Sequence, residues 1–553
     1  MNALKFYIGG EWVDPSHAET IEVINPATEE VIETISAGSA EDVDRAVSAA
    51  RTAFHDFSRT SRGERIELLT KVRETYKKRF EDIAEAIRLE MGAPLHLARG
   101  GQTAVGLGHL ATAIRVLQDF EYEEEKEGFL IRYEPIGVCG LITPWNWPMN
   151  QIVAKLAPAV ASGCTCVLKP SELAPLSAHI MAEIMDEAGV PPGVFNLVDG
   201  YGPVVGEAMS AHPDIDMMSF TGSTRGGVAV AKGSADTVKR VSQELGGKSA
   251  NIILDDEQLE ESVRRGVLGC MENTGQSCNA PTRMLVPAAR YDEALEIAQE
   301  VTKSLVTDMP DLEETQIGPV VSSTQFEKVQ GLISSGIEEK ATLVAGGIGR
   351  PEHLDTGYFV RPTIFGGVTP DMTIFKEEIF GPVLSMIPYS NSEEAVRIAN
   401  DTPYGLAAYV SGSDETELLG YARELRAGQV HLNYTGGGTN APFGGFKQSG
   451  NGREKAEWGF HEFMECKKEP CEPQRCFKAP HWFQPTESSK QRFGRLLCVL
   501  FQNDPESEFG DVLLQAKEKE LGEEDICRTD LALESSETCQ NSDRSCVWAA
   551  KIK

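Results

Sequence analysis

One cysteine lies among small and polar residues, in the stretch Asn273-Thr-Gly-Gln-Ser-Cys278-Asn-Ala-Pro-Thr-Arg283. A cysteine buried only for packing usually lies among aliphatic side chains, where its thiolate is disfavoured and its sulfur is inert. The neighbours of Cys278 instead offer backbone and side-chain donors that can stabilise a thiolate or an oxyanion. From this stretch alone, a nucleophile and a structural thiol are about equally well supported.

A second stretch, Ser242-Gln-Glu244-Leu-Gly-Gly-Lys-Ser-Ala-Asn251, places a carboxylate 34 residues before the thiol. Without a cysteine partner, Glu244 would be read as an ordinary carboxylate at the end of a helix or strand. Together, Glu244-Leu-Gly-Gly-Lys248 and Gly275-Gln-Ser-Cys278 resemble the two signature motifs of the aldehyde dehydrogenase superfamily, and the resemblance covers roughly residues 5–468. Within the superfamily, the chain is most similar to bacterial-type, NAD-linked, non-acylating enzymes that act on semialdehyde or oxo-acid substrates.

The resemblance implies a reaction in which aldehyde, NAD and water give a carboxylate and NADH. Cys278 would attack the aldehyde, forming a thiohemiacetal and then a thioester. The backbone N–H of Cys278 and the side-chain amide of Asn146, in Thr143-Pro-Trp-Asn146-Trp-Pro148, would hold the oxyanion. Glu244 would activate the water that hydrolyses the thioester, which favours release of a free acid over transfer to coenzyme A. Lys155 and Glu454 match positions that relay a proton, and they are equally consistent with a structural ion pair.

The resemblance also implies a cofactor site at the carboxyl edge of a parallel sheet, where ligands bind in such folds. Glu172 would accept hydrogen bonds from the ribose hydroxyls and repel a 2′-phosphate, which favours NAD over NADP. The glycine-rich turn Phe220-Thr-Gly222-Ser223 would receive the pyrophosphate at a helix N-terminus. The complete implied set is Ile142, Thr143, Pro144, Trp145, Lys169, Ser171, Glu172, Phe220, Gly222, Ser223, Gly227, Leu245, Glu378 and Phe380, with Glu378 at the nicotinamide ribose and Phe380 against the nicotinamide ring. No metal site is predicted.

Composition limits the classes of partner and compartment. The chain has 553 residues, a net charge of −32 and 25% charged residues, so binding to nucleic acid or to an anionic membrane is not expected. The N-terminus does not have the pattern of a signal peptide, and no apolar run is long enough to span a bilayer. Cys164 and Cys166 are close together, but their spacing matches neither a zinc site nor a thioredoxin-type motif. We therefore predict a reducing, cytoplasmic location.

Hydrophobic periodicity predicts how the chemistry is positioned. Helical patterns run through residues 41–57, 61–91 and 95–120, and from residue 137 strands and helices alternate. A second alternating unit begins after Ile252. Such alternation is typical of parallel sheets with helices on both faces. The predicted class is therefore α/β: an aldehyde dehydrogenase fold with a Rossmann-like NAD-binding domain, an α/β catalytic domain and a small β oligomerisation arm.

The predicted boundaries are residues 1–117 and 137–245 for the NAD-binding domain, 246–454 for the catalytic domain, and 118–136 with 455–468 for the arm. The arm predicts a homodimer or homotetramer because a monomer would expose strand edges; the alternative for residues 121–136 is a solvated hairpin. Residues 469–553 show no sustained periodicity and are predicted to be mostly disordered, with a short helix over 512–521. A genuine extension and a misjudged end of the gene both remain open.

Two other functions remain open at this point. An acylating dehydrogenase would need coenzyme A and would tolerate loss of Glu244. An inactive or structural relative of the family is also possible, although Cys278, Glu244 and Asn146 together argue against it. The small-molecule substrate is an aldehyde that the sequence does not name. Its tunnel is expected near residues 149–152, Ser277, Asn279 and residues 434–440.

Overall fold

The computed structural model describes residues 2–126 and 129–470. Contacts divide the chain into one unit of residues 1–124 and 131–468 and a second of residues 125–130 and 469–553. The features discussed below belong to the first unit unless stated otherwise. The predicted helix over 512–521 lies outside the described residues, as does the predicted extension apart from Glu469 and Pro470.

The first sheet has eight strands in the order β19-β11-β10-β7-β8-β9-β1-β2. Strands β7 to β11 run parallel, while β1, β2 and β19 are antiparallel to their neighbours. The bounds are β1 Phe6–Ile8, β2 Glu11–Val13, β7 Val138–Ile142, β8 Thr165–Lys169, β9 Phe195–Leu197, β10 Met217–Thr221, β11 Arg240–Glu244 and β19 Gly450–Asn451.

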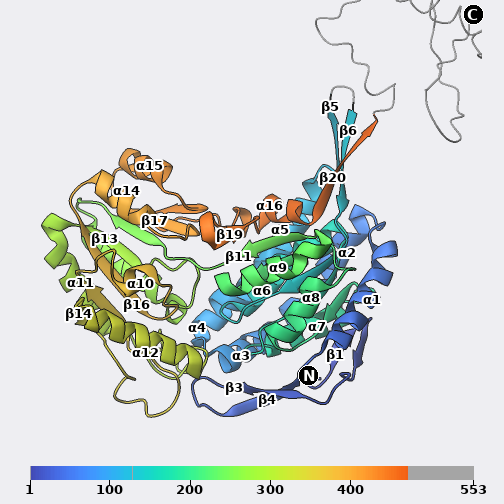
Figure 1. The fold of residues 1–553 in the computed structure, drawn as a ribbon, viewed down its shortest axis with the longest axis horizontal. Coiled ribbons are helices and arrows are strands. Elements are labelled where there is room, and N and C mark those ends of the chain that lie inside the picture. Colours follow the sequence, from blue (N-terminus) through green and yellow to red (C-terminus); the bar gives the residue numbers. More distant parts are fainter. Residues whose placement is uncertain (1, 127–128, 471–553) are drawn as a thin grey trace, which may run out of the picture. The chain divides into compact units, whose positions relative to one another are not determined.

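Helices cover both faces of this sheet (Figure 1). On β7, Cys139 and Leu141 join one apolar cluster, while Val138 and Ile142 join another. The first cluster contains residues of α2, α3, α5, α6 and α7, and the second contains residues of α1, α8 and α9. This double burial explains why the parallel strands read as continuous apolar runs. The bounds are α1 Ala40–Phe57, α2 Arg62–Lys78, α3 Phe80–Met91, α4 Leu95–Leu97, α5 Ala104–Asp119, α6 Pro148–Ser162, α7 Leu176–Glu187, α8 Glu207–Ala211 and α9 Thr224–Ser234.

Two long helical patterns are interrupted in the structure. The pattern over 61–91 divides into α2 and α3 at Arg79, and the pattern over 95–120 divides into α4, a π-helical segment Ala98–Thr103 and α5. The second interruption contains Gly100 and Gly101, and glycine weakens a helix interior by about 1 kcal/mol relative to alanine. The periodicity therefore predicted the helical regions but not their breaks.

The second sheet has seven strands in the order β14-β15-β16-β13-β12-β17-β18, and all neighbours are parallel except β14 and β15. Residues of α10 and α11 form an apolar cluster with some of its strands, and residues of α12 to α15 form another. The strand bounds are β12 Ala250–Ile253, β13 Arg283–Pro287, β14 Thr342–Ala345, β15 Thr363–Gly366, β16 Val383–Tyr389, β17 Ala407–Ser411 and β18 Gln429–Leu432. The helix bounds are α10 Leu259–Met271, α11 Tyr291–Ser304, α12 Ser323–Glu338, α13 Thr373–Lys376, α14 Ser392–Asn400 and α15 Glu415–Glu424.

Smaller elements complete the described part of the chain. Strands β3 Thr20–Ile24 and β4 Val31–Ser36 pair antiparallel, and β5 Glu123–Lys126, β6 Phe129–Pro135 and β20 Met464–Pro470 form a sheet in the order β20-β6-β5. Helix α16, Ala456–Glu462, buries Phe460 against Phe120, with ring centroids 4.6 Å apart. No described helix is both long enough and apolar enough to cross a membrane.

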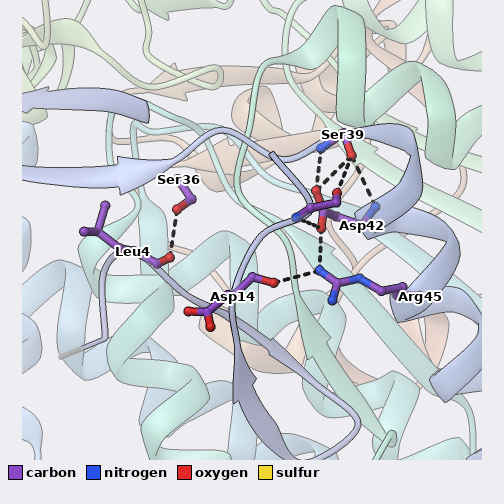
Figure 2. Close-up of polar contacts among 7 residues, drawn as sticks. Leu4, Asp14, Ser36, Ser39, Asp42 and Arg45 are labelled. Atoms are coloured by element: carbon purple, nitrogen blue, oxygen red, sulfur yellow. Dashed lines mark hydrogen bonds and ion pairs between the residues drawn. The ribbon is translucent and has the colours of Figure 1, made fainter. Parts of the chain in front are cut away.

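A buried carboxylate fixes the start of α1 (Figure 2). The N–H of Ser39 donates to Asp42 Oδ2 at 2.9 Å, and the N–H of Ser16 and Arg45 Nη2 donate to Asp42 Oδ1 at 2.9 and 2.6 Å. Ser39 Oγ in turn accepts from the N–H of Asp42, which completes a capping box. Burial opposes ionisation, but these hydrogen bonds prevail and lower the pKa of Asp42.

We predict that Asp42→Asn lowers the free energy of unfolding by about 2 kcal/mol, because hydrogen bonds to a charged group are lost. Since folding lowers the pKa of Asp42, its stabilisation is complete above the ordinary aspartate value and is lost as pH falls through the folded-state value. The melting temperatures of wild type and variant should therefore differ at pH 7, and this difference should shrink at pH 3. Glu41→Gln, at the exposed neighbouring position, is the matched control. A variant as stable as this control would contradict the prediction.

Candidate active site

Cys278 lies on a loop with an unusual backbone between α10 and β13. Asn273 and Thr274 have φ of 53° and 56°, and Gly275 follows with φ of 69°. A Cβ at Gly275 would overlap the carbonyl of Gly381, so the loop requires glycine there. Non-glycine residues in this region of φ carry strain that the surrounding structure must hold. The thiol at the end of this loop is free and half-buried.

Hydrogen bonds join this loop to the segment before α6. Asn146 Nδ2 donates to the carbonyl of Gln276 at 2.9 Å, and Asn273 Nδ2 donates to the carbonyl of Asn146 at 2.9 Å. Trp147 Nε1 donates to Ser277 Oγ at 2.8 Å. Pro148 then begins α6 at a position where proline favours helix initiation. Asn146 therefore contacts the residue that lies two positions before Cys278 in the sequence.

Glu244 ends β11 with both carboxyl oxygens buried, and neither oxygen has a hydrogen-bond partner within the described chain. Burial and then Glu454 raise its pKa well above the usual value, while Lys155, Arg453 and Lys455 oppose that rise. Burial of this kind disfavours the charged form of the carboxyl. Such a group suits proton transfer to and from a reacting water.

Lys155 and Glu454 form a buried ion pair beside Glu244. Lys155 projects from α6 and also donates to Ser219 Oγ of β10 at 3.1 Å. The two residues predicted to act together are therefore adjacent. Their contact accommodates both interpretations drawn from the sequence, a proton relay and a structural pair.

Acidic groups crowd the thiol. Burial, followed by Glu378, Glu244 and Glu454, raises the pKa of Cys278 to about 12, while Lys455 opposes this rise. The thiol is therefore protonated at neutral pH in the absence of ligands. Attack on a carbonyl requires that this proton leave, because the thiolate is the nucleophile.

The predicted cofactor residues gather where three parallel strands end. Ile142 on β7 is the register partner of Lys169 on β8 and of Phe220 on β10. Lys169 Nζ donates to the carbonyl of Pro170 at 2.8 Å and to Glu172 Oε2 at 3.4 Å. The segments that follow these strands carry the other predicted residues of this edge, namely Thr143, Pro144, Trp145, Ser171, Gly222 and Ser223.

Two hydroxyl groups at this edge differ in whether they already have a hydrogen-bond partner. The hydroxyl of Ser223 already accepts the N–H of Gly226 at 3.2 Å and caps α9, whereas it was predicted to serve the pyrophosphate. Thr143 Oγ1 is buried and has no hydrogen-bond partner among the residues that the structure describes. A buried hydroxyl without a partner is costly, so a ligand at this edge would satisfy it.

The remaining predicted cofactor residues pack around the glycines of the Glu244 motif. Glu378 Oε1 accepts the N–H of Gly247 at 2.8 Å, and a Cβ at Gly246 would lie 2.5 Å from Glu378 Oε2. Leu245 packs so closely on Gly227 that no larger residue fits there. Phe380 has φ of 59° and meets Trp145 edge to face, with ring centroids 5.3 Å apart.

Sequence reasoning missed several side chains near Cys278. Tyr409 Oη donates to the carbonyl of Asn279 at 3.1 Å, and its ring stacks on His431 at 4.8 Å and tilts against Tyr434 at 5.0 Å. Tyr409 and His431 lie on β17 and β18, far from the motifs, and no local pattern marks them, whereas Tyr434 in the following loop belongs to the predicted tunnel lining. Lys455 follows Glu454 directly, so its adjacency to a motif residue was the available signal.

A cavity of about 550 Å³ lies next to this cluster. Tyr434, predicted to line a substrate tunnel, is among its lining residues, and so is Asn273 from the cysteine loop. The wall combines apolar Leu97, Leu268 and Met271 with polar and charged side chains that include Arg265. A space of this size can hold a small-molecule ligand.

The model of the aldehyde dehydrogenase family matches residues 12–468. The chain belongs to the aldehyde dehydrogenase family. It is 55% identical over 464 residues to a 3-succinoylsemialdehyde-pyridine dehydrogenase of Pseudomonas sp, covering 84% of this chain and 97% of the relative. A mutant of aldehyde dehydrogenase C from Pseudomonas syringae, solved with NAD+ and octanal, is 51% identical with a TM-score of 0.84, covering 85% of this chain and 97% of that one.

A Mycobacterium tuberculosis aldehyde dehydrogenase solved with NAD+ is 38% identical, with a TM-score of 0.83 and coverage of 85% and 98% of the two chains. The family resemblance, the α/β fold and the class of enzyme predicted from the sequence are thereby confirmed. The domain boundaries and the roles of individual residues stay predictions.

We predict that alkylation of Cys278 by iodoacetamide, without cofactor, speeds up across pH 7 to 10 without a plateau, because the pKa of the thiol is about 12. Glu378→Gln removes the carboxylate that most strongly raises this pKa after burial. The rate at pH 8 should then rise roughly threefold to tenfold. Peptide mass spectrometry separates Cys278 from the other thiols. The control is Glu377→Gln at the exposed adjacent position, and equal rates in both variants would refute the electrostatic explanation.

Proposed function

We propose that this aldehyde dehydrogenase oxidises an aldehyde to a free carboxylic acid, with NAD+ as acceptor, through a thioester on Cys278. The observation that carries the proposal is the convergence of Cys278, Asn146 and Glu244, each held by a different element. The two solved relatives with NAD+ agree with the predicted cofactor. Glu172 at the end of β8 favours NAD over NADP, because a carboxylate repels a 2′-phosphate.

The chain's own residues perform the following steps. The Cys278 thiol releases its proton to solvent water, and its sulfur adds to the carbonyl carbon. Asn146 Nδ2, which has a second N–H beyond the one bonded to Gln276, and the N–H of Cys278 hold the resulting oxyanion. The residues at the carboxyl edge of the first sheet would hold NAD+, which would supply the hydride acceptor for oxidation of the thiohemiacetal to the thioester. Glu244 takes a proton from water, the water oxygen attacks the thioester, and the sulfur leaves as thiolate.

Two further buried groups, Glu454 and Lys155, can carry a proton away from Glu244. Glu454 is close enough to raise the pKa of Glu244, and Lys155 links Glu454 to Ser219. A chain of buried ionisable groups of this kind passes a proton in small steps. We propose that Lys155 and Glu454 act in this way, with Glu244 as the group that exchanges protons with the substrate water.

We also propose, as the sequence predicts, a homodimer or homotetramer in the cytoplasm. The small sheet β20-β6-β5 lies largely within the predicted oligomerisation arm, residues 118–136 and 455–468, which supports this assembly. All six cysteines of the described residues are free thiols, which suits a reducing compartment. Light scattering of the purified chain tests the assembly, and a monomer at micromolar concentration would contradict it.

We predict that Glu244→Gln lowers kcat by about 100- to 10,000-fold, because a general base is lost. A burst of NADH equal to the enzyme concentration should remain, since thioester formation does not need this base. In wild type, kcat should rise with pH, because the raised pKa keeps Glu244 protonated at low pH. Stopped-flow absorbance measures both quantities.

Glu257→Gln, at an exposed site, is the control for this experiment. Loss of the burst together with the steady rate would assign Glu244 to an earlier step. Added coenzyme A distinguishes the acylating alternative, because it would restore turnover of the variant only if the thioester passes to a thiol.

A further inference from the structure

An ammonium group beside the nucleophile has no role in the mechanism above. Lys455 directly follows Glu454, yet its backbone has φ of 69°, and Ala456 follows with φ of 49°. Two consecutive non-glycine residues in this region are strained, and such strain persists only where surrounding contacts hold it. The carbonyl of Lys455 accepts the N–H of Gly459 at 2.9 Å in the first turn of α16. This turn lets the Glu454 side chain contact Lys155 while the Lys455 side chain contacts Phe443.

The surroundings of Lys455 are apolar on one side. Its Nζ lies 4.4 Å from the ring centroid of Phe443, a cation–π contact. Phe443 is fixed in turn by two backbone hydrogen bonds with Glu454, at 2.7 and 2.9 Å. Within residues 2–126 and 129–470, the Lys455 ammonium forms no hydrogen bond and no ion pair. A half-buried cation in this situation lacks the counter-charge that such groups normally have.

Nearby acids supply this counter-charge only in part. Glu454 is bound to Lys155, and burial raises the pKa of Glu244 and of Cys278, which disfavours their charged forms. Burial lowers the pKa of Lys455, and the proximity of Glu454, Cys278 and Glu244 opposes this.

The other side of Lys455 carries neutral polar groups. His109 on α5 pairs with Asn150 Oδ1 at 2.8 Å, and burial together with Lys455 lowers its pKa to about 3. Burial and Lys455 also lower the pKa of His431, although its bond to Thr435 opposes this. Both imidazoles are therefore uncharged at neutral pH. Lys455 is the cation near these two imidazoles, and its charge also acts on the nucleophile.

We propose that Lys455 is a specificity-determining residue that binds the carboxylate of a semialdehyde, a substrate with an aldehyde at one end and a carboxylate at the other. This inference rests on the proposed function, because it assumes that the aldehyde carbon lies at Cys278. An ammonium with three free donors gains most from an anionic oxygen acceptor, and a substrate carboxylate supplies that charge only while bound. The class of substrate follows: short oxo acids rather than simple aldehydes.

The experiment compares two aldehydes of equal chain length, 4-oxobutanoate and butanal, by NADH formation. Wild type should prefer 4-oxobutanoate. Lys455→Met keeps the length of the side chain and removes its charge, so KM for 4-oxobutanoate should rise about 100-fold, as expected for loss of a buried charge pair. Any effect of the lost ammonium on the Cys278 thiol acts on both aldehydes alike, so the ratio of kcat/KM for 4-oxobutanoate to kcat/KM for butanal should fall about 100-fold. Lys455→Arg should retain most of the preference.

Lys71→Met, at an exposed position on helix α2, is the control for loss of a lysine. Melting temperatures establish that each variant is folded. An equal loss of kcat/KM for both aldehydes in Lys455→Met would overturn the proposal and assign Lys455 to the chemistry at Cys278. A wild type without preference for 4-oxobutanoate would also overturn it.

Failure of the proposed function has a different signature. If wild type oxidises neither aldehyde, binding of butyrate, which carries the carboxylate alone, is measured by calorimetry. Binding to wild type that weakens at least tenfold in Lys455→Met supports the carboxylate site independently of turnover. Equal binding to both proteins rejects it.

Discussion

The active site depends on the hydrogen bonds between Asn146 and the cysteine loop. Asn146 Nδ2 donates to Gln276, Asn273 Nδ2 donates back to the carbonyl of Asn146, and Gln102 Nε2 contacts both the Asn146 carbonyl at 3.3 Å and Asn273 Oδ1 at 3.1 Å. These bonds connect the segment after β7 with the loop before β13, so each sheet supplies one side. They also hold the left-handed backbone that presents Cys278, which would otherwise relax.

Charge is the second constraint, because the site collects more acids than bases around a buried thiol. Glu378, Glu244 and Glu454 all favour the protonated form of Cys278, and Lys455 opposes them. Without ligands, the Cys278 thiol therefore keeps the proton that it must lose before it attacks. The thiol becomes reactive only when it loses this proton, so it stays inert while no substrate is bound.

Local motifs were sufficient to select Cys278, Glu244 and Asn146 as candidates for the chemistry, since each lies in a short recognisable sequence. Alternating periodicity likewise predicted two α/β units. Tertiary contacts determined the rest. The π-helical segment before α5 interrupts a continuous apolar pattern, and the Ser223 hydroxyl caps α9. Tyr409 and His431 come together beside the cysteine loop only through the pairing of β17 with β18. Lys455 follows a predicted residue, but its direction depends on a backbone turn that no pattern specifies.

The central claim is that oxidation proceeds through a thioester on Cys278, and intact-protein and peptide mass spectrometry tests it most directly. The chain is mixed with NAD+ and excess aldehyde and quenched in acid within the first turnovers. The account predicts an added mass equal to the acyl group on the peptide that contains Cys278, absent in Cys278→Ala. An unmodified Cys278 peptide during active NADH formation, or the acyl group on another residue, would contradict it.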